Sequence, residues 1–157
     1  MPTSDDAAAE HAGSAATPGE RNIRLPAGLE ALEALIPEVE GFCADRGLDA
    51  SAAFALNVAL DELVNNVVSY GLADGGDHFL EVRLRVSGDQ LTVEVEDDGV
   101  AFDPFDRPPP DTDLPLEERP IGGLGIEIVR QLMDEARYQR QGDRNLVTLR
   151  RTLGERG

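Results

Sequence analysis

A carboxylate and a carboxamide are spaced one helical turn apart in the middle of the chain. Glu62 and Asn66 lie four residues apart in the segment DELVNNVVSYG, and side chains at this spacing project from the same face of a helix. The carboxylate can accept a proton from a hydroxyl group, and the amide oxygen can bind Mg²⁺. A solvated polar face on a surface helix is the alternative that these two residues alone leave open.

A second polar group follows an alternating stretch of apolar residues, in the segment VEDDGVAFDP. Asp97 ends the alternation, and Gly99 follows two residues later. A carboxylate in this place can accept a hydrogen bond from an exocyclic amine, and a glycine lets the backbone approach a flat ring. An ordinary acidic turn is the alternative. A calcium loop of the EF-hand type is excluded, because its central glycine and closing glutamate are missing.

A third segment, the glycine-rich IGGLGI at residues 121–126, opens directly into an apolar helical pattern. Backbone amides at the start of such a helix can receive phosphate oxygens. The glycines follow an irregular stretch rather than a strand, which argues against a dinucleotide-binding fingerprint. Arg119 can reach a terminal phosphate, or it can pair with Glu117 or Glu118 instead. The chain has no lysine, so a Walker A phosphate loop is excluded.

Helices and strands must bring these three segments together. Apolar residues at helical spacing predict helices over residues 29–47 and 49–71 and a third helix from Gly122. Asp49 or Ser51 can cap the second helix. Alternating patterns predict strands at 22–25, 78–86, 90–96, 136–140 and 145–150.

The order of these elements predicts an α+β fold, because it lacks the regular alternation of a parallel sheet. We expect a two-layer α/β sandwich in which about three helices cover one face of a mostly antiparallel mixed sheet. One folded domain spans residues 21–152, between a flexible acidic tail at 1–20 and a short tail at 153–157. The stretch 98–120 holds six of the ten prolines and is either a disordered linker or a functional lid, which we place at 103–121.

The order and separation of the three polar segments resemble the N, G1 and G2 boxes of the GHKL ATPase superfamily. Within it, the chain is most similar to the anti-sigma-factor serine/threonine kinases. The resemblance is carried by DELVNNVVSYG, VEDDGVAFDP, ERPIGGLGIEIVRQLMDE and NLVTLRR, and it covers roughly residues 22–152. It implies a Bergerat-type ATP-binding fold with ATP and Mg²⁺ as cofactors.

The resemblance implies a role for each matching position. Glu62 would be the general base, and Asn66 would bind the magnesium ion. Asp97 would hold the adenine amine, Gly99 would leave room for the ring, and Arg119 would steady the transferred group. The other positions implied in nucleotide binding are Phe102, Gly122, Gly123, Leu124, Gly125 and Thr148.

Two positions complicate the comparison. Thr148 falls where the family places a hydroxyl near the base, although a core or sheet-pairing threonine is the alternative. Many relatives have a histidine shortly after the asparagine of the N box, where this chain has Ser69 and Tyr70.

The resemblance also implies partners. A kinase of this family would phosphorylate a STAS-domain anti-sigma-factor antagonist, sequester a sigma factor and form a homodimer. The alternative is a regulatory module that binds ATP without transferring phosphate. A sensor histidine kinase is excluded, because it needs a helical hairpin with a phosphoacceptor histidine, and His11 and His78 are the only histidines.

Charge and hydropathy limit the remaining classes. The formal net charge of −17 would repel phosphates, which argues against direct nucleic-acid binding. The sequence has neither a run of eighteen apolar residues nor the pattern of a signal peptide, so we expect no membrane segment and a cytoplasmic protein. Cys43 is the single cysteine and can form no intrachain disulfide.

Overall fold

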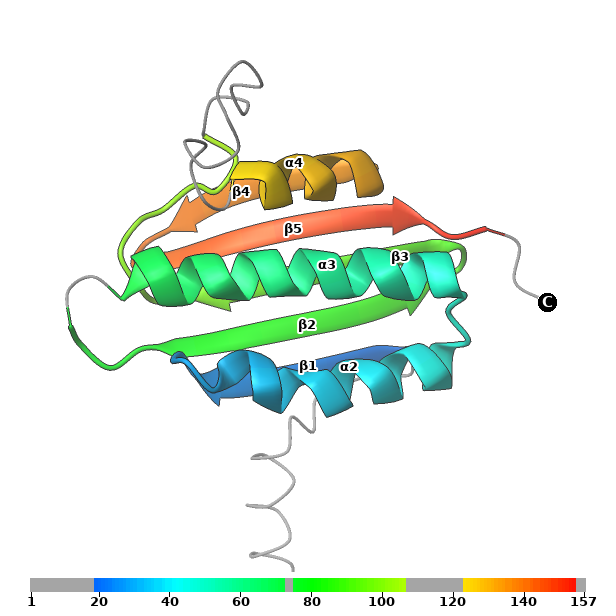
Figure 1. Cartoon of the computed structure of the whole chain (residues 1–157), viewed down its shortest axis with the longest axis horizontal. Coiled ribbons are helices and arrows are strands. Elements are labelled where there is room, and N and C mark those ends of the chain that lie inside the picture. The colour runs from blue at the N-terminus through cyan, green and yellow to red at the C-terminus, as the bar shows by residue number, and fades with distance from the viewer. Residues whose placement is uncertain (1–18, 73–74, 107–122, 155–157) are drawn as a thin grey trace, which may run out of the picture.

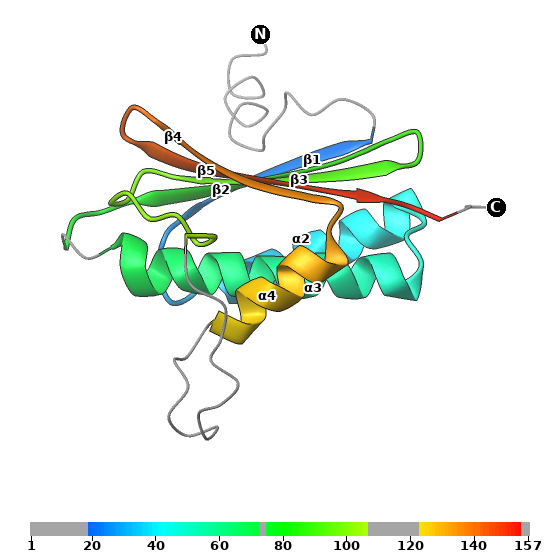
Figure 2. The ribbon, with the colours of Figure 1, turned by 90° about the horizontal axis from the view of Figure 1, so that it is seen from above.

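The computed structural model describes residues 19–72, 75–106 and 123–154. In this part of the chain, five strands form one antiparallel sheet in the order β1-β2-β3-β5-β4. Three α-helices lie together against one face of that sheet (Figure 1, Figure 2). The predicted two-layer α+β fold is therefore confirmed. The predicted N-terminal tail and most of the predicted lid fall outside the described residues.

The strands follow the alternating segments of the sequence, and their ends differ from the predicted ones by at most two residues. β2 and β3 form one hairpin and β4 and β5 form another. β1 pairs with β2 across two helices, and β3 pairs with β5 across α4 and β4. The pairing places the end of β3 beside the start of β5. Their bounds are β1 Glu20–Pro26, β2 Phe79–Ser87, β3 Gln90–Asp97, β4 Glu135–Gln141 and β5 Arg144–Thr152.

The three α-helices are α2 (Ala31–Arg46), α3 (Ala50–Asn66) and α4 (Gly123–Leu132). Asp49 caps α3, since its side chain accepts a hydrogen bond from the backbone nitrogen of Ala52 at 2.8 Å. α3 continues without a break into a wider π-helical segment, η1 (Val67–Gly71), which the periodicity of the sequence did not predict. The widened turn lies directly after the two residues expected to do chemistry.

A single apolar core fills the space between the sheet and the helices. Alternate residues of β2, β3 and β5 are buried there, as their period of two requires. α3 packs its predicted apolar arc against them. This packing fixes the rotation of α3 and hence the direction of its polar side chains. The largest fully buried side chains are Phe42, Leu35, Leu56, Leu80, Leu84, Leu91, Leu149, Val64, Val82, Val93 and Val129.

The other side of the sheet, which we call the open face, carries charged residues in the described part of the chain. Arg83 of β2 contacts Glu94 and Glu96 of β3 at 2.9 and 3.0 Å. Arg144 of β5 contacts Glu96 at 2.9 Å. Opposite charges on adjacent strands thus support the sheet where no helix covers it.

Candidate functional site

A small cavity lies between α3 and the sheet, at the end where β3 finishes and β5 begins. Its volume is about 20 Å³, which is room for about one water molecule. Three separate parts of the chain supply its walls, and they include two of the segments singled out in the sequence, those of Asn66 and Asp97. The lining residues are Leu63, Asn66, Val67, Gly71, Val95, Asp97, Phe102, Pro104, Asn145 and Val147.

Asn66 brings an unsatisfied polar group to this cavity. Its side chain is only 6% exposed, and its amide nitrogen has no hydrogen-bond partner among the described residues. Leaving such a group unpaired costs about 1–3 kcal/mol, so a ligand, an ion or a water molecule in the cavity is expected to satisfy it. Rotation of the carboxamide can present either its oxygen or its nitrogen to that ligand.

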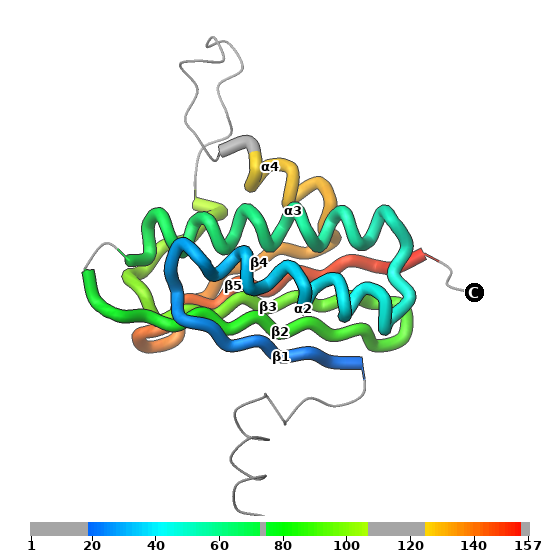
Figure 3. Tube along the Cα trace, turned by 60° about the horizontal axis from the view of Figure 1, so that its bottom comes forward, coloured from blue at the N-terminus to red at the C-terminus, as the bar shows by residue number. Residues whose placement is uncertain are grey.

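Glu62 lies one turn earlier on α3 and reaches the first turn of α4. An ideal Cβ on Gly125 would lie 1.9 Å from a carboxylate oxygen of Glu62, so any side chain at that position would displace the Glu62 carboxylate. Figure 3 shows α4 next to α3. The structure therefore brings the predicted base and the glycine-rich segment into direct contact, although more than sixty residues separate them in the chain.

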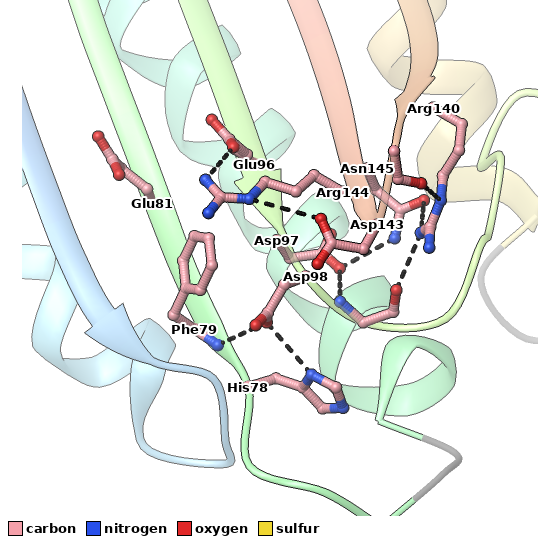
Figure 4. A network of polar contacts seen from close by, with 12 residues as sticks. His78, Phe79, Glu81, Glu96, Asp97, Asp98, Arg140, Asp143, Arg144 and Asn145 are labelled. Carbon is pink, nitrogen blue, oxygen red and sulfur yellow. Dashed lines mark hydrogen bonds and ion pairs between the residues drawn. The ribbon is translucent and has the colours of Figure 1, made fainter.

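Asp97 is the buried carboxylate of the site. It is 4% exposed, and its Oδ1 accepts hydrogen bonds from the Gly99 nitrogen at 2.8 Å and from Asn145 Nδ2 at 2.9 Å (Figure 4). Burial raises the pKa of Asp97, and these two hydrogen bonds offset only part of the rise. Both of these hydrogen bonds go to Oδ1, so Oδ2 is the oxygen that would accept one from a ligand.

The neighbouring Asp98 makes its contacts outside the cavity. Its carboxylate accepts a hydrogen bond from the Phe79 nitrogen at 2.9 Å, and it lies 3.2 Å from His78 Nδ1 (Figure 4). These contacts attach the start of β2 to the end of β3. Only one of the two adjacent aspartates therefore lines the cavity.

Gly99 allows two backbone segments to touch. An ideal Cβ there would lie 2.2 Å from the carbonyl oxygen of Gly71, and that oxygen accepts a hydrogen bond from the Val100 nitrogen at 2.9 Å. Gly99 is not among the residues that line the cavity. The close approach that Gly99 allows in this structure is to the protein's own backbone, and its place beside a bound ring stays a prediction.

Phe102 closes one side of the cavity. Its backbone nitrogen donates to Asn145 Oδ1 at 3.3 Å, and its ring stacks on Tyr70 with the centroids 4.7 Å apart and an angle of 18° between the planes. Tyr70 is the second-to-last residue of the π-helical segment, at the position where the sequence departs from many relatives. Two segments far apart in the chain are thus joined by an aromatic pair.

The prediction for Thr148 is wrong in its geometry. Val147 and Leu149 are both buried under the helices, so the alternation of β5 places Thr148 on the open face, where it pairs with Glu94. The polar side chain of β5 that does line the cavity is Asn145. The alternation of the strand could have identified Asn145, since residues two apart point to the same face of the sheet and Val147 points to the helix-covered face.

The remaining predicted residues are placed only in part. Gly123 and Leu124 form the first residues of α4. Arg119 and Gly122 lie outside the described residues. Among the predicted site residues, Asn66, Asp97 and Phe102 therefore line one cavity, and Glu62, one turn before Asn66, meets Gly125.

The chain belongs to the family described as the histidine kinase-like ATPase domain, which matches residues 25–151. The fold and the site thus define an ATP-binding domain of the GHKL class, and the resemblance to its anti-sigma-factor kinases is confirmed.

Relatives of the chain carry the names of protein kinases. Serine/threonine-protein kinase BtrW of Bordetella bronchiseptica is 30% identical over 100 residues, which make up 64% of this chain and 70% of that protein. Serine-protein kinase RsbW of Listeria monocytogenes is 29% identical over 119 residues, or 73% and 76% of the two chains. RsbW of Bacillus subtilis is 26% identical over 139 residues, or 85% and 86%.

A solved structure has the same fold. The crystal structure of the RsbU and RsbW domains of a Mycobacterium tuberculosis protein matches 85% of this chain with a TM-score of 0.61 and 22% identity. This chain spans 32% of that longer chain.

No helix within residues 19–72, 75–106 and 123–154 combines the length and apolar character needed to cross a membrane.

Proposed function

We propose that this chain is a protein serine/threonine kinase of the anti-sigma-factor type. It would transfer a phosphoryl group from Mg²⁺-bound ATP to a STAS-domain anti-sigma-factor antagonist, and it would sequester a sigma factor. One observation carries the proposal: from the same helix, Asn66 brings an unsatisfied amide to the cavity that Asp97 also lines, and Glu62, one turn earlier, meets Gly125 of α4. The kinase names of the relatives support the same activity.

The residues present fit a magnesium nucleotide. The second oxygen of Asp97 would accept a hydrogen bond from the adenine amine, and the Asn66 carboxamide would hold the magnesium ion. The backbone amides of Gly123 and Gly125 would receive phosphate oxygens at the positive end of α4. Since the cavity holds about 20 Å³, binding must open it, and the wall that includes Phe102 is the one not built from regular structure.

Transfer would need one proton acceptor from the protein. Bound ATP supplies the phosphoryl group, and positioning supplies most of the rate enhancement. The Glu62 carboxylate would take the proton from the substrate serine hydroxyl as the serine oxygen bonds to the γ-phosphorus. The bond from that phosphorus to the β,γ-bridging oxygen breaks, and ADP leaves. Arg119 would steady the negative charge on the transferred group.

The test compares Glu62→Gln with Asp61→Asn, which removes one charge from the exposed side of the same helix. Each protein is incubated with MgATP and a STAS-domain protein, and phosphoserine is measured by mass spectrometry. Glu62→Gln is expected to slow transfer by at least about 100-fold, while calorimetric ATP affinity stays within about threefold of wild type. Asp61→Asn should retain transfer.

Other outcomes have clear meanings. Transfer at the wild-type rate by Glu62→Gln would contradict the role of this residue as a base. Tight ATP binding by the wild type without transfer to any STAS protein would favour the regulatory module that binds ATP without catalysis. Failure to bind adenine nucleotide at all would remove both functions.

Self-association is the last part of the proposal. Leu29 is 90% exposed and Ile36 is 49% exposed, and Leu29 borders an apolar groove formed by the end of β1 and the start of α2. An unpartnered apolar surface of this kind supports a homodimer. Sedimentation of the wild type should show a dimer that Leu29→Asp or Ile36→Asp weakens. A monomer at all concentrations would contradict it.

A further inference from the structure

A short connecting segment forms one wall of the proposed nucleotide cavity. We call residues 99–106 the strap; they follow the end of β3 and belong to no helix or strand. Phe102 and Pro104 of the strap line the cavity, and Phe105 packs against the apolar core. The strap, which is yellow-green in Figure 1, runs from the sheet towards α4. Its position therefore decides how much space the cavity offers.

The strap is tied down where it begins. The Val100 nitrogen donates a hydrogen bond to a carbonyl oxygen of η1 at 2.9 Å, and the Gly99 carbonyl oxygen accepts one from Arg140 at 2.9 Å (Figure 4). The next backbone contact, from the Phe102 nitrogen to Asn145 Oδ1, is longer at 3.3 Å. A movement of the strap would therefore pivot after Val100 and displace the residues that follow.

The far part of the strap folds into a turn of its own. The Asp103 side chain accepts a hydrogen bond from the Phe105 nitrogen at 2.8 Å, and the Asp103 carbonyl oxygen accepts one from the Asp106 nitrogen at 3.2 Å. An aspartate that binds the backbone two residues later stabilises such a turn. The turn therefore moves as a unit, and a contact to Phe105 also positions Phe102 and Pro104.

Arg130 of α4 holds this turn. Its Nη2 donates a hydrogen bond to the Phe105 carbonyl oxygen, and its guanidinium carbon lies 5.5 Å from the centre of the Phe105 ring, within the range of a cation–π contact. Glu127, one turn earlier on the helix, lies 3.7 Å from Arg130 Nη1 and supports its direction. One helix side chain thus contacts both the backbone and the ring of Phe105.

The held position of the strap leaves too little room for a nucleotide. The cavity measures about 20 Å³, and a nucleotide base is far larger than the one water molecule that this volume admits. The other walls come from α3, η1, β3 and β5, which the apolar core and the strand pairing keep in place. The strap is the wall that can yield, so each contact that holds it against α4 adds to the free energy that binding must supply.

We propose that Arg130 is a positioning residue that holds the strap closed and thereby slows the entry of MgATP. It acts through Phe105 and need not touch the nucleotide. Without this contact the open strap would be more populated, and a protein whose binding-competent state is more populated binds its ligand more tightly. The inference rests on the proposed nucleotide-binding function and deepens it.

The experiment measures the entry and release of a magnesium nucleotide directly. The full chain is mixed with Mg²⁺ and ATP that carries a fluorophore on its ribose, and both rate constants are followed by stopped flow. Arg130→Met removes the hydrogen bond and the cation–π contact but keeps a good helix former. We expect its association rate constant to rise about fivefold with the dissociation rate constant unchanged. Arg130→Lys keeps a charged donor and should stay within about twofold of the wild type.

The direction of the effect separates positioning from the other roles that an arginine can have. If Arg130 attracted the phosphates itself, its loss would slow association and weaken binding. If Arg130 only stabilised the fold, Arg130→Met would lower the melting temperature and leave both rate constants at their wild-type values. Arg137→Met is the matched control, because it removes the same charge from the exposed edge strand, and its association rate constant should not rise.

The outcomes also separate this inference from the function on which it rests. If the wild type takes up no adenine nucleotide, the proposed function fails, and the inference fails with it. If the wild type binds ATP and Arg130→Met associates at the wild-type rate or more slowly, only the inference is overturned. Should Arg130→Met not fold, Phe105→Leu decides, because it removes the ring and keeps an apolar side chain against the core: faster association supports the inference, and an unchanged or slower rate overturns it.

Discussion

Two adjacent carboxylates of β3, Glu96 and Asp97, point to opposite faces of the sheet and have pKa values shifted in opposite directions. On the open face, burial alone would raise the pKa of Glu96, but hydrogen bonds and charges from Arg144 and Arg83 outweigh it and lower the pKa. On the helix-covered face, burial raises the pKa of Asp97, and no arginine donates a hydrogen bond to it among the described residues. A carboxylate kept buried without a neutralising partner is characteristic of a binding site.

The two shifts have opposite consequences for stability. The lowered pKa of Glu96 contributes stability above the pKa of the unfolded chain, and this is lost as pH falls through the folded pKa. The raised pKa of Asp97 makes its ionised form a cost at neutral pH, which is relieved as pH falls through its folded pKa. At pH 7, therefore, ionised Glu96 on the open face stabilises the fold, whereas ionised Asp97 on the covered face destabilises it.

The largest expected difference between the faces is in ligand binding. Asp97→Ala removes the proposed acceptor and should weaken MgATP binding by about 100-fold, the loss of a charge-assisted hydrogen bond. Glu96→Ala, one residue earlier on the open face, should change the affinity by less than about twofold. Calorimetric titration measures both. Equal losses in the two variants would remove the distinction between the faces.

The second-largest effect is expected on stability, from the backbone contact of Gly99 at the covered face. Gly99→Ala places a methyl group 2.2 Å from the Gly71 carbonyl oxygen, so the free energy of unfolding should fall by about 2–3 kcal/mol. Gly154→Ala is the control, because nothing lies within 4 Å of a Cβ there. Urea denaturation followed by circular dichroism compares them. Equal stabilities would show that this close approach does not constrain the fold.

The opposite pKa shifts predict opposite effects of neutral replacements at pH 7. Glu96→Gln should lower the free energy of unfolding by about 1 kcal/mol and flatten its fall in acid. Asp97→Asn should raise that free energy at pH 7 by a similar amount, although it weakens ATP binding. Denaturation at several pH values gives both curves. The same sign in both variants would contradict the comparison.

The smallest effect is expected at the exposed edge strand. Arg137 is 67% exposed and contacts Glu135 at 2.8 Å, and exposed ion pairs of this kind contribute little. Arg137→Ala should change the melting temperature by less than about 2 °C, which corresponds to under about 0.5 kcal/mol. A larger change would mean that the open face depends on its outermost charges as much as on Arg83.

The covered face also shows what the sequence could and could not predict. Local patterns predicted the strands, the helices and the joint direction of Glu62 and Asn66, because period and capping are properties of neighbouring residues. The contact of Glu62 with Gly125 and the pairing of Asp97 with Asn145 depend on how distant segments pack. The motif match selects Thr148 rather than Asn145, because a match of residue types takes no account of which face of β5 each side chain occupies.

One titration tests the central claim that the covered face binds a magnesium nucleotide. MgATP is added to ¹⁵N-labelled protein, and amide chemical shifts are followed by NMR. We predict saturable shifts at Asn66, Gly99, Phe102 and Gly125, with the amides of Arg83, Glu94 and Thr148 nearly unchanged. An absence of shifts, or shifts centred on the open face, would contradict the account.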